Sequence, residues 1–146
     1  MALLNYRSPN ELNERFDRTW QSNVNPLGNN GRFAVESYLD FHGNKFTRRF
    51  DANSYITLVN AMNSHDIARG RDSVEFALAK ITATSLVVAI SSDRLFPLEG
   101  QQIIAEGIKS KLVADKLHVV ESAFGHDGFL IERDTVGPLL RQLLES

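Results

Sequence analysis

Hydrophobic residues in the second half of the chain switch between short continuous runs and helical stripes. The run SLVVAISS at 85–92 is rich in β-branched residues, which is typical of a strand buried on both faces. A second run, KLHVVES at 116–122, predicts another strand. Helices are predicted over 98–112, between the two runs, and over 136–144, after the second. Their apolar faces consist of Ile104, Ile108 and Leu112, and of Val136, Leu139, Leu140, Leu143 and Leu144.

The first half reads as helices and loops. A short polar helix is predicted over 10–18 after a Ser-Pro start, and a longer one over 33–50. The segment 21–32 is rich in Asn, Gly and Pro without periodicity, which predicts a loop. A further short helix would begin at Asp72 or Ser73 and run through Lys80. One clean helical stripe consists of Tyr55, Leu58, Val59 and Met62.

The order of elements in the second half predicts a specific but incomplete fold. Strand, helix, strand and helix in succession indicate a parallel pair joined by a right-handed crossover. Two parallel strands make a very small sheet, and parallel sheets are normally wider and covered on both faces. The second half therefore resembles the edge of a larger α/β structure. Either the chain is a fragment, or it pairs with another chain.

Composition narrows the class of protein. The 146 residues suggest one domain or a piece of one, with 42% hydrophobic and 23% charged residues and a formal net charge of −2. With no basic stripe, no nucleic-acid partner is expected. The absence of cysteine excludes disulfides and thiolate metal sites. No membrane partner, signal peptide or metal site is indicated, so we expect a cytoplasmic protein.

Two polar residues follow the ends of the two predicted strands. Asp93 comes directly after the first strand, and His126 lies in the turn FGHDG after the second. Functional residues of open α/β sheets gather at the carboxyl ends of the strands, so the two side chains should share one rim. A carboxylate beside a histidine orients the imidazole and stabilises its protonated form. The alternatives are a helix N-cap for Asp93 and an exposed turn for His126.

A nucleophile to complete a catalytic triad is missing. The chain contains neither cysteine nor a G-x-S-x-G elbow, in which a strained turn exposes a serine. Ser91 and Ser92 lie too close to Asp93 along one strand to act as that serine. The triad is therefore incomplete within this chain.

Several stretches resemble one known family. The segment YLDFHGNKFTRRFDANSYITLVNAMNSHD at 38–66, followed by SSDRLFP and GHDGFL, is similar to the C-terminal half of homoserine O-acetyltransferases. The opening YRS…ELNERF at 6–16 is similar to the start of the helical lid of that family. The resemblance covers nearly the whole chain, and its most specific part is the long segment at 38–66.

The resemblance implies a fold and an activity. It implies the C-terminal part of an α/β-hydrolase, with residues 1–80 as a helical lid region and 81–146 as the last two parallel strands and their helices. Family enzymes transfer an acetyl group from acetyl-CoA to L-homoserine in methionine biosynthesis, through an acetylated serine in a ping-pong mechanism. Acetyl-CoA is a co-substrate, and no cofactor is expected. The resemblance also implies a homodimer formed through the lid.

The resemblance further implies roles for four residues. Asp93 would be the triad acid and His126 the general base, while Asp127 and Tyr6 would bind the substrate. The nucleophilic serine, the oxyanion hole and a substrate-binding arginine would lie upstream, so the isolated chain is expected to be inactive. Two alternatives stay open: a non-catalytic module that dimerises through the lid, and a related acyltransferase that uses succinyl-CoA or L-serine.

Overall fold

The computed structural model describes residues 2–28 and 30–146, which form two compact units. The first unit consists of Met1–Leu12 and Ile67–Ser146, and the second of Asn13–Asp66. The division at residue 80 into lid and core is a functional assignment, and it stays a prediction.

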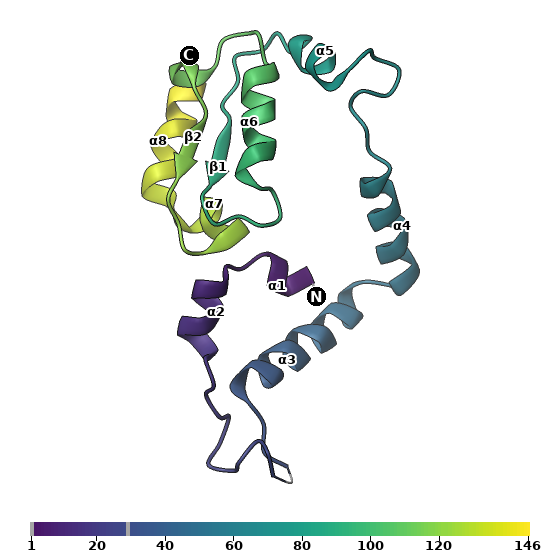
Figure 1. The fold of residues 1–146 in the computed structure, drawn as a ribbon, viewed down its shortest axis with the longest axis vertical. Coiled ribbons are helices and arrows are strands. Elements are labelled where there is room, and N and C mark those ends of the chain that lie inside the picture. The colour runs from purple at the N-terminus through teal and green to yellow at the C-terminus, as the bar shows by residue number, and fades with distance from the viewer. Residues whose placement is uncertain (1, 29) are drawn as a thin grey trace. The chain divides into compact units, whose positions relative to one another are not determined.

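The first unit contains the predicted parallel strand pair, shown in Figure 1 with helices α6 and α8 flanking it. Strand β1 is Val88–Ile90 and strand β2 is His118–Val120, so both are shorter than predicted. They pair in parallel from Val88↔His118 to Ile90↔Val120. Before the sheet, Ser85 forms an isolated parallel bridge with Leu112. The expectation of a parallel strand pair is confirmed, with three paired residues in each strand.

The helix after β1 ends earlier than predicted. Helix α6 is Leu98–Gly107, whereas the apolar stripe predicted 98–112. Ile108 has extended backbone angles, and its side chain is buried in the core. Gly107 lowers the helix propensity at this point, and its missing side chain lets Leu78 approach to within van der Waals contact. The predicted helix over Ile108 and Leu112 is therefore wrong, although Ile108 is buried and the partly buried Leu112 packs against the core.

The core of this unit lies between the strands and α6. Val87, Ala105 and Ile108 form its buried centre, and partly buried hydrophobic residues pack around them: Ile81, Leu112 and Leu117. Helix α5 (Val74–Ala79) begins at Ser73, whose side chain accepts from the Phe76 N–H, so Ser73 rather than Asp72 is the N-cap. The remaining elements of the unit are α1 (Ala2–Asn5), η1 (Val113–Asp115), η2 (Gly125–Asp127), α7 (Gly128–Ile131) and the predicted terminal helix α8 (Arg133–Leu144).

The second unit is helical, as predicted. Helix α2 (Pro9–Phe16) runs into it, and α3 (Ala34–Arg49) passes through Gly43 without a break. Helix α4 (Ala52–Asn63) follows after Asp51, whose side chain accepts from the Ser54 N–H as an N-cap.

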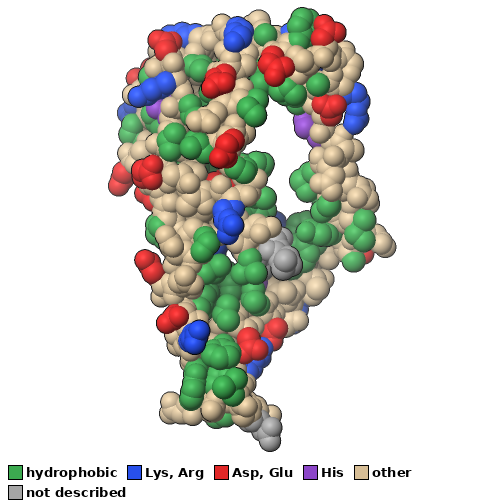
Figure 2. Space-filling model, viewed as in Figure 1, with side chains coloured by type: hydrophobic (Ala, Val, Ile, Leu, Met, Phe, Trp, Pro, Cys, Tyr) green, Lys and Arg blue, Asp and Glu red, His purple; other side chains and the backbone are tan. Residues whose placement is uncertain are grey.

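The apolar stripe of α4 lies on the surface of the second unit. Tyr55, Leu58 and Met62 are 40%, 53% and 67% exposed. Hydrophobic side chains are visible along this helix in the space-filling view (Figure 2). The predicted helix is confirmed, but its stripe does not form a buried core among the described residues. None of the described helices is long and apolar enough to cross a membrane.

Candidate active site

Asp93 uses its two carboxylate oxygens for different purposes. It lies in the turn that leaves β1, where its N–H donates to the Ile90 carbonyl. Oδ1 accepts from the backbone N–H groups of Leu95 (2.8 Å) and Phe96 (3.0 Å), which holds the turn before α6. Oδ2 remains for His126. Asp93 is therefore not the N-cap of α6, which is Pro97, and the alternative of a helix N-cap is wrong.

His126 lies in the η2 turn after β2 and faces Asp93. The distance from its Nδ1 to Asp93 Oδ2 is 2.8 Å. An ionised carboxylate can only accept, so the imidazole donates its Nδ1–H, and Nε2 of the neutral ring is the basic nitrogen. The expectation that the two side chains meet at one rim of the sheet is confirmed.

Burial strengthens this contact. The side chain of Asp93 is 6% exposed and that of His126 is 18% exposed. Hydrogen bonds to charged groups become stronger where water is excluded, and the carboxylate also retains its two backbone donors. An imidazolium formed during proton transfer would find its counterion already in position.

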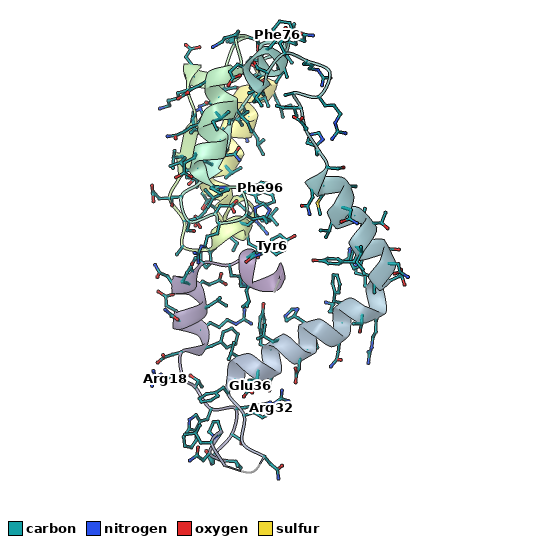
Figure 3. All side chains as sticks on the ribbon, turned by 45° about the vertical axis from the view of Figure 1, so that its right-hand side comes forward. Tyr6, Arg18, Arg32, Glu36, Phe76 and Phe96 are labelled. Carbon is teal, nitrogen blue, oxygen red and sulfur yellow. The ribbon has the colours of Figure 1, made fainter. Side chains whose placement is uncertain are left out.

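Three aromatic rings surround the imidazole of His126. The ring centroids of Tyr6, Phe96 and Phe129 lie 5.4, 5.1 and 5.4 Å from its centroid. Tyr6, just after α1, and Phe96, in the loop after β1, are both labelled in Figure 3. The resemblance indicated Tyr6, whereas Phe96 and Phe129 were missed. Their positions three residues after Asp93 and after His126 were the available signal.

The N-terminal segment 6–8 packs backbone against backbone on the His126 turn. Ser8 is 2% exposed, and its hydroxyl donates to the Ala123 carbonyl while accepting from the Glu11 N–H as the N-cap of α2. Gly125 has a φ of +63°, and a Cβ there would lie 2.8 Å from both Ser8 N and Tyr6 O. Only glycine suits this backbone angle and this close approach. The S-x-x-E capping pattern of Ser8 and Glu11 was a readable signal for the cap, but not for the contact.

Asp127 points toward a cation of the same N-terminal segment. Its Oδ2 lies 3.9 Å from Arg7 Nη2, and Arg7 also forms an ion pair with Glu11. The Asp127 carboxylate remains 33% exposed, so it is accessible from outside. Arg7 was missed by the sequence reasoning, although it stands next to the predicted Tyr6. All four predicted site residues therefore lie in the first unit, close to one another.

Asp93 and His126 belong to the lining of an open groove of about 740 Å³. Its other walls come from β1, from α6 through Ile104 and from α8 through Val136 and Leu140. Among the described residues, its lining includes β1 but not β2, so the groove follows the side of β1 that faces away from β2. No group of three or more His, Asp or Glu side chains in the described part of the chain could hold a metal ion.

Comparison with known proteins finds relatives that match the whole chain. No protein-family profile matches the chain. The chain is 63% identical over all 146 residues to a homoserine O-acetyltransferase of Leifsonia xyli subsp. xyli, of which it covers 36%. It is 58% identical over its whole length to that of Clavibacter michiganensis subsp. michiganensis, of which it covers 38%. The chain is homologous over its whole length to part of a homoserine O-acetyltransferase. It spans a little over a third of the length of these relatives.

Solved structures agree on the fold. The crystal structure of homoserine O-acetyltransferase from Bacillus anthracis matches 97% of the chain with a TM-score of 0.77 and 18% identity, and the chain covers 38% of it. The structure of esterase E22 matches 95% of the chain with a TM-score of 0.69 and 21% identity, and the chain covers 39% of it. At these identities the likeness concerns the fold alone. The predicted resemblance to homoserine O-acetyltransferases and the predicted fold class, part of an α/β-hydrolase, are both confirmed.

Proposed function

We propose that this chain supplies the acid, the base and part of the substrate site of a homoserine O-acetyltransferase. The observation that carries the proposal is the contact of 2.8 Å between His126 Nδ1 and Asp93 Oδ2, within a sequence 63% identical to a protein of that name. The nucleophilic serine would come from the part of the family protein that this chain does not span. The chain alone should therefore be inactive, since it lacks the nucleophile that the pair activates.

In the proposed reaction His126 acts twice as a base. Nε2 takes the proton of the serine hydroxyl, whose oxygen attacks the thioester carbonyl of acetyl-CoA. The C–S bond then breaks, the proton passes to the leaving CoA thiolate, and acetyl-serine remains. In the second half His126 takes the proton of the homoserine hydroxyl, which attacks the acetyl-serine, and returns it to the serine oxygen. Asp93 stabilises the imidazolium in both halves.

The substrate roles of Asp127 and Tyr6 belong to the same proposal. The Asp127 carboxylate is accessible and follows His126 directly, which suits it to bind the ammonium group of homoserine. Tyr6 lies with its ring against the imidazole and is 39% exposed. Arg7 limits this assignment, because its guanidinium competes with an ammonium ion for the same carboxylate. An acyl donor other than acetyl-CoA, such as succinyl-CoA, and L-serine as acceptor stay within the proposal as alternatives.

The groove along β1 supports assembly with the rest of such an enzyme. In a parallel ladder alternate residues bond the same neighbour. The Val87 carbonyl accepts from His118 and the Ser91 N–H donates to Val120, so the N–H groups of Val88 and Ile90 point to the opposite edge, where the groove lies. A further parallel strand would satisfy these groups and cover the apolar walls.

Reassembly from two parts tests the proposed function. The chain is mixed with the separately produced remainder of the Leifsonia xyli relative, and thiol release from acetyl-CoA is measured with and without L-homoserine. Release should require both parts, and Asp93→Asn and His126→Gln should each lower it by roughly 10³-fold or more. His65→Gln, a substitution of an exposed histidine in the second unit, should leave it unchanged. Parts that associate without releasing thiol, or a fully active His126→Gln assembly, would contradict the proposal.

Dimer formation through the lid region 1–80 is a second proposal. It holds both for an enzyme and for the alternative, a non-catalytic module that dimerises through the lid. The exposed Tyr55, Leu58 and Met62 of α4 support it, since large exposed apolar patches often mark interaction sites. Sedimentation should find a dimer of the chain and a monomer for Met62→Lys, with Asn60→Lys on the same helix as control. A monomeric unsubstituted chain would contradict it. We also propose a cytoplasmic location, because the proposed reaction uses acetyl-CoA as donor. Cell fractionation tests this location.

A further inference from the structure

Ser92 connects the two loops that carry the catalytic pair. Its hydroxyl donates to the Ser122 carbonyl at 2.6 Å and accepts from the Gly125 N–H at 3.0 Å. Ser92 directly precedes Asp93, and Gly125 directly precedes His126. One side chain therefore bridges the two backbone positions next to the acid and the base.

This bridge begins where the sheet ends. The last paired residues of the strands are Ile90 and Val120, and the Ser91 N–H adds one more backbone bond to Val120. Beyond that point the two segments are linked by hydrogen bonds from serine side chains. The Ser91 hydroxyl accepts from the Ser122 N–H at 3.2 Å, and Ser92 provides the two bonds already described. Of these two serines, Ser92 is the one that reaches the residue before His126.

The geometry requires the oxygen of Ser92 rather than its volume. Without the hydroxyl, the Gly125 N–H would lose its bonding partner in a residue that is itself buried. Gly125 also carries the left-handed backbone angle that turns the chain toward His126. A shift of this residue moves the imidazole directly, and hydrogen bonding between Nδ1 and the Asp93 carboxylate is sensitive to shifts of a few tenths of an ångström.

We propose that Ser92 is a positioning residue, which holds His126 at bonding distance from Asp93 by linking the Gly125 N–H to the Ser122 carbonyl. This inference rests on the proposed function, because it assigns a role toward the same acid and base. Ser92 takes no part in the chemistry, since its hydroxyl oxygen is engaged with the η2 turn.

The test follows the imidazole proton by NMR in the full 146-residue chain, which needs no catalytic activity. The Nδ1–H resonance of His126, identified by its absence in His126→Gln, reports the bond to Asp93. In Ser92→Ala its exchange with water should accelerate about tenfold or more, with amide protection in β1 and β2 retained. Ser92→Thr, which keeps the hydroxyl, should restore slow exchange. Ser110→Ala, which removes a hydroxyl bonded to the Ala83 carbonyl, is the matched control and should change nothing.

The possible outcomes separate the two proposals. Ser92→Ala with intact strands and an unchanged Nδ1–H exchange rate would overturn the positioning role. If Ser92→Ala loses the strand protection, Ser92→Cys provides a similar volume with a much weaker donor and acceptor. Loss of the strands in that variant as well would assign Ser92 to sheet stability and would also overturn the role. A missing Nδ1–H resonance in the unsubstituted chain would instead contradict the Asp93–His126 contact and the proposed function with it.

Discussion

Replacing Gly125 by alanine tests the packing of the N-terminal segment 6–8 on the His126 turn. The alanine Cβ would lie 2.8 Å from Ser8 N and Tyr6 O and 2.9 Å from the carbonyl carbon of Arg7. All three are backbone atoms, which cannot rotate away as the end of a side chain can. The segment must therefore move off the turn, or the turn must change its backbone angles.

The magnitude of this effect has two parts. Alanine at a φ of +63° costs roughly 1–2 kcal/mol, because its Cβ approaches its own backbone. The overlap with the segment 6–8 adds about 1–3 kcal/mol, as is usual for overpacking. Together the free energy of unfolding of the first unit should fall by about 2–5 kcal/mol. Gly70 is the matched control, since it has a φ of +69° and a Cβ there would meet no atom within 4 Å.

Hydrogen exchange of the β1 and β2 amides measures the stability of the first unit without interference from the second. Gly70→Ala should show only the backbone part, about 1–2 kcal/mol. Gly125→Ala should exceed it by about 1–3 kcal/mol, the part due to the overlap. Equal losses in the two variants would refute the reasoning, because they would mean that the segment 6–8 does not press on the turn.

Two further predictions concern the caps of helices. Ser8→Ala should lower the stability of the first unit by about 1–3 kcal/mol, measured by the same exchange, because the Glu11 N–H and the Ala123 carbonyl both lose their partner; an unchanged value would contradict it. Accepting the Ser54 N–H lowers the pKa of Asp51 below its ordinary value. Its capping contribution to α4 is therefore complete above pH about 4 and lost as the pH falls through the lowered pKa. NMR shifts of α4 should report this loss, and Asp51→Asn should remove it.

The sequence alone determined the elements and the rim at which they place their chemistry. Two β-branched runs separated by one helix imply neighbouring parallel strands, and such strands end at a common edge. Asp93 and His126 follow those runs, so the topology of the strands places both residues at the same edge. For this reason their contact was predictable even though 33 residues separate them.

The end of α6 and the exposure of the apolar stripe of α4 could not be predicted in this way. A periodic apolar pattern shows which residues of a segment are apolar. It does not show which other segment, if any, covers them. Ile108 continues the helical pattern but reaches the core from an extended backbone beside Val87. Tyr55 and Met62 follow the pattern of a buried face, yet they lie on the surface of their unit.

Only the tertiary structure decided how the His126 turn is held. Ser8 and Ala123 are 115 residues apart, and no local propensity links a serine at a helix start to a carbonyl near the other end of the chain. The division of labour between the two oxygens of Asp93, and the two bonds of the Ser92 hydroxyl, likewise depend on angles that appear once the strands are paired. Local pattern specifies which strands form and in what order, whereas distances between side chains on separate elements follow from packing.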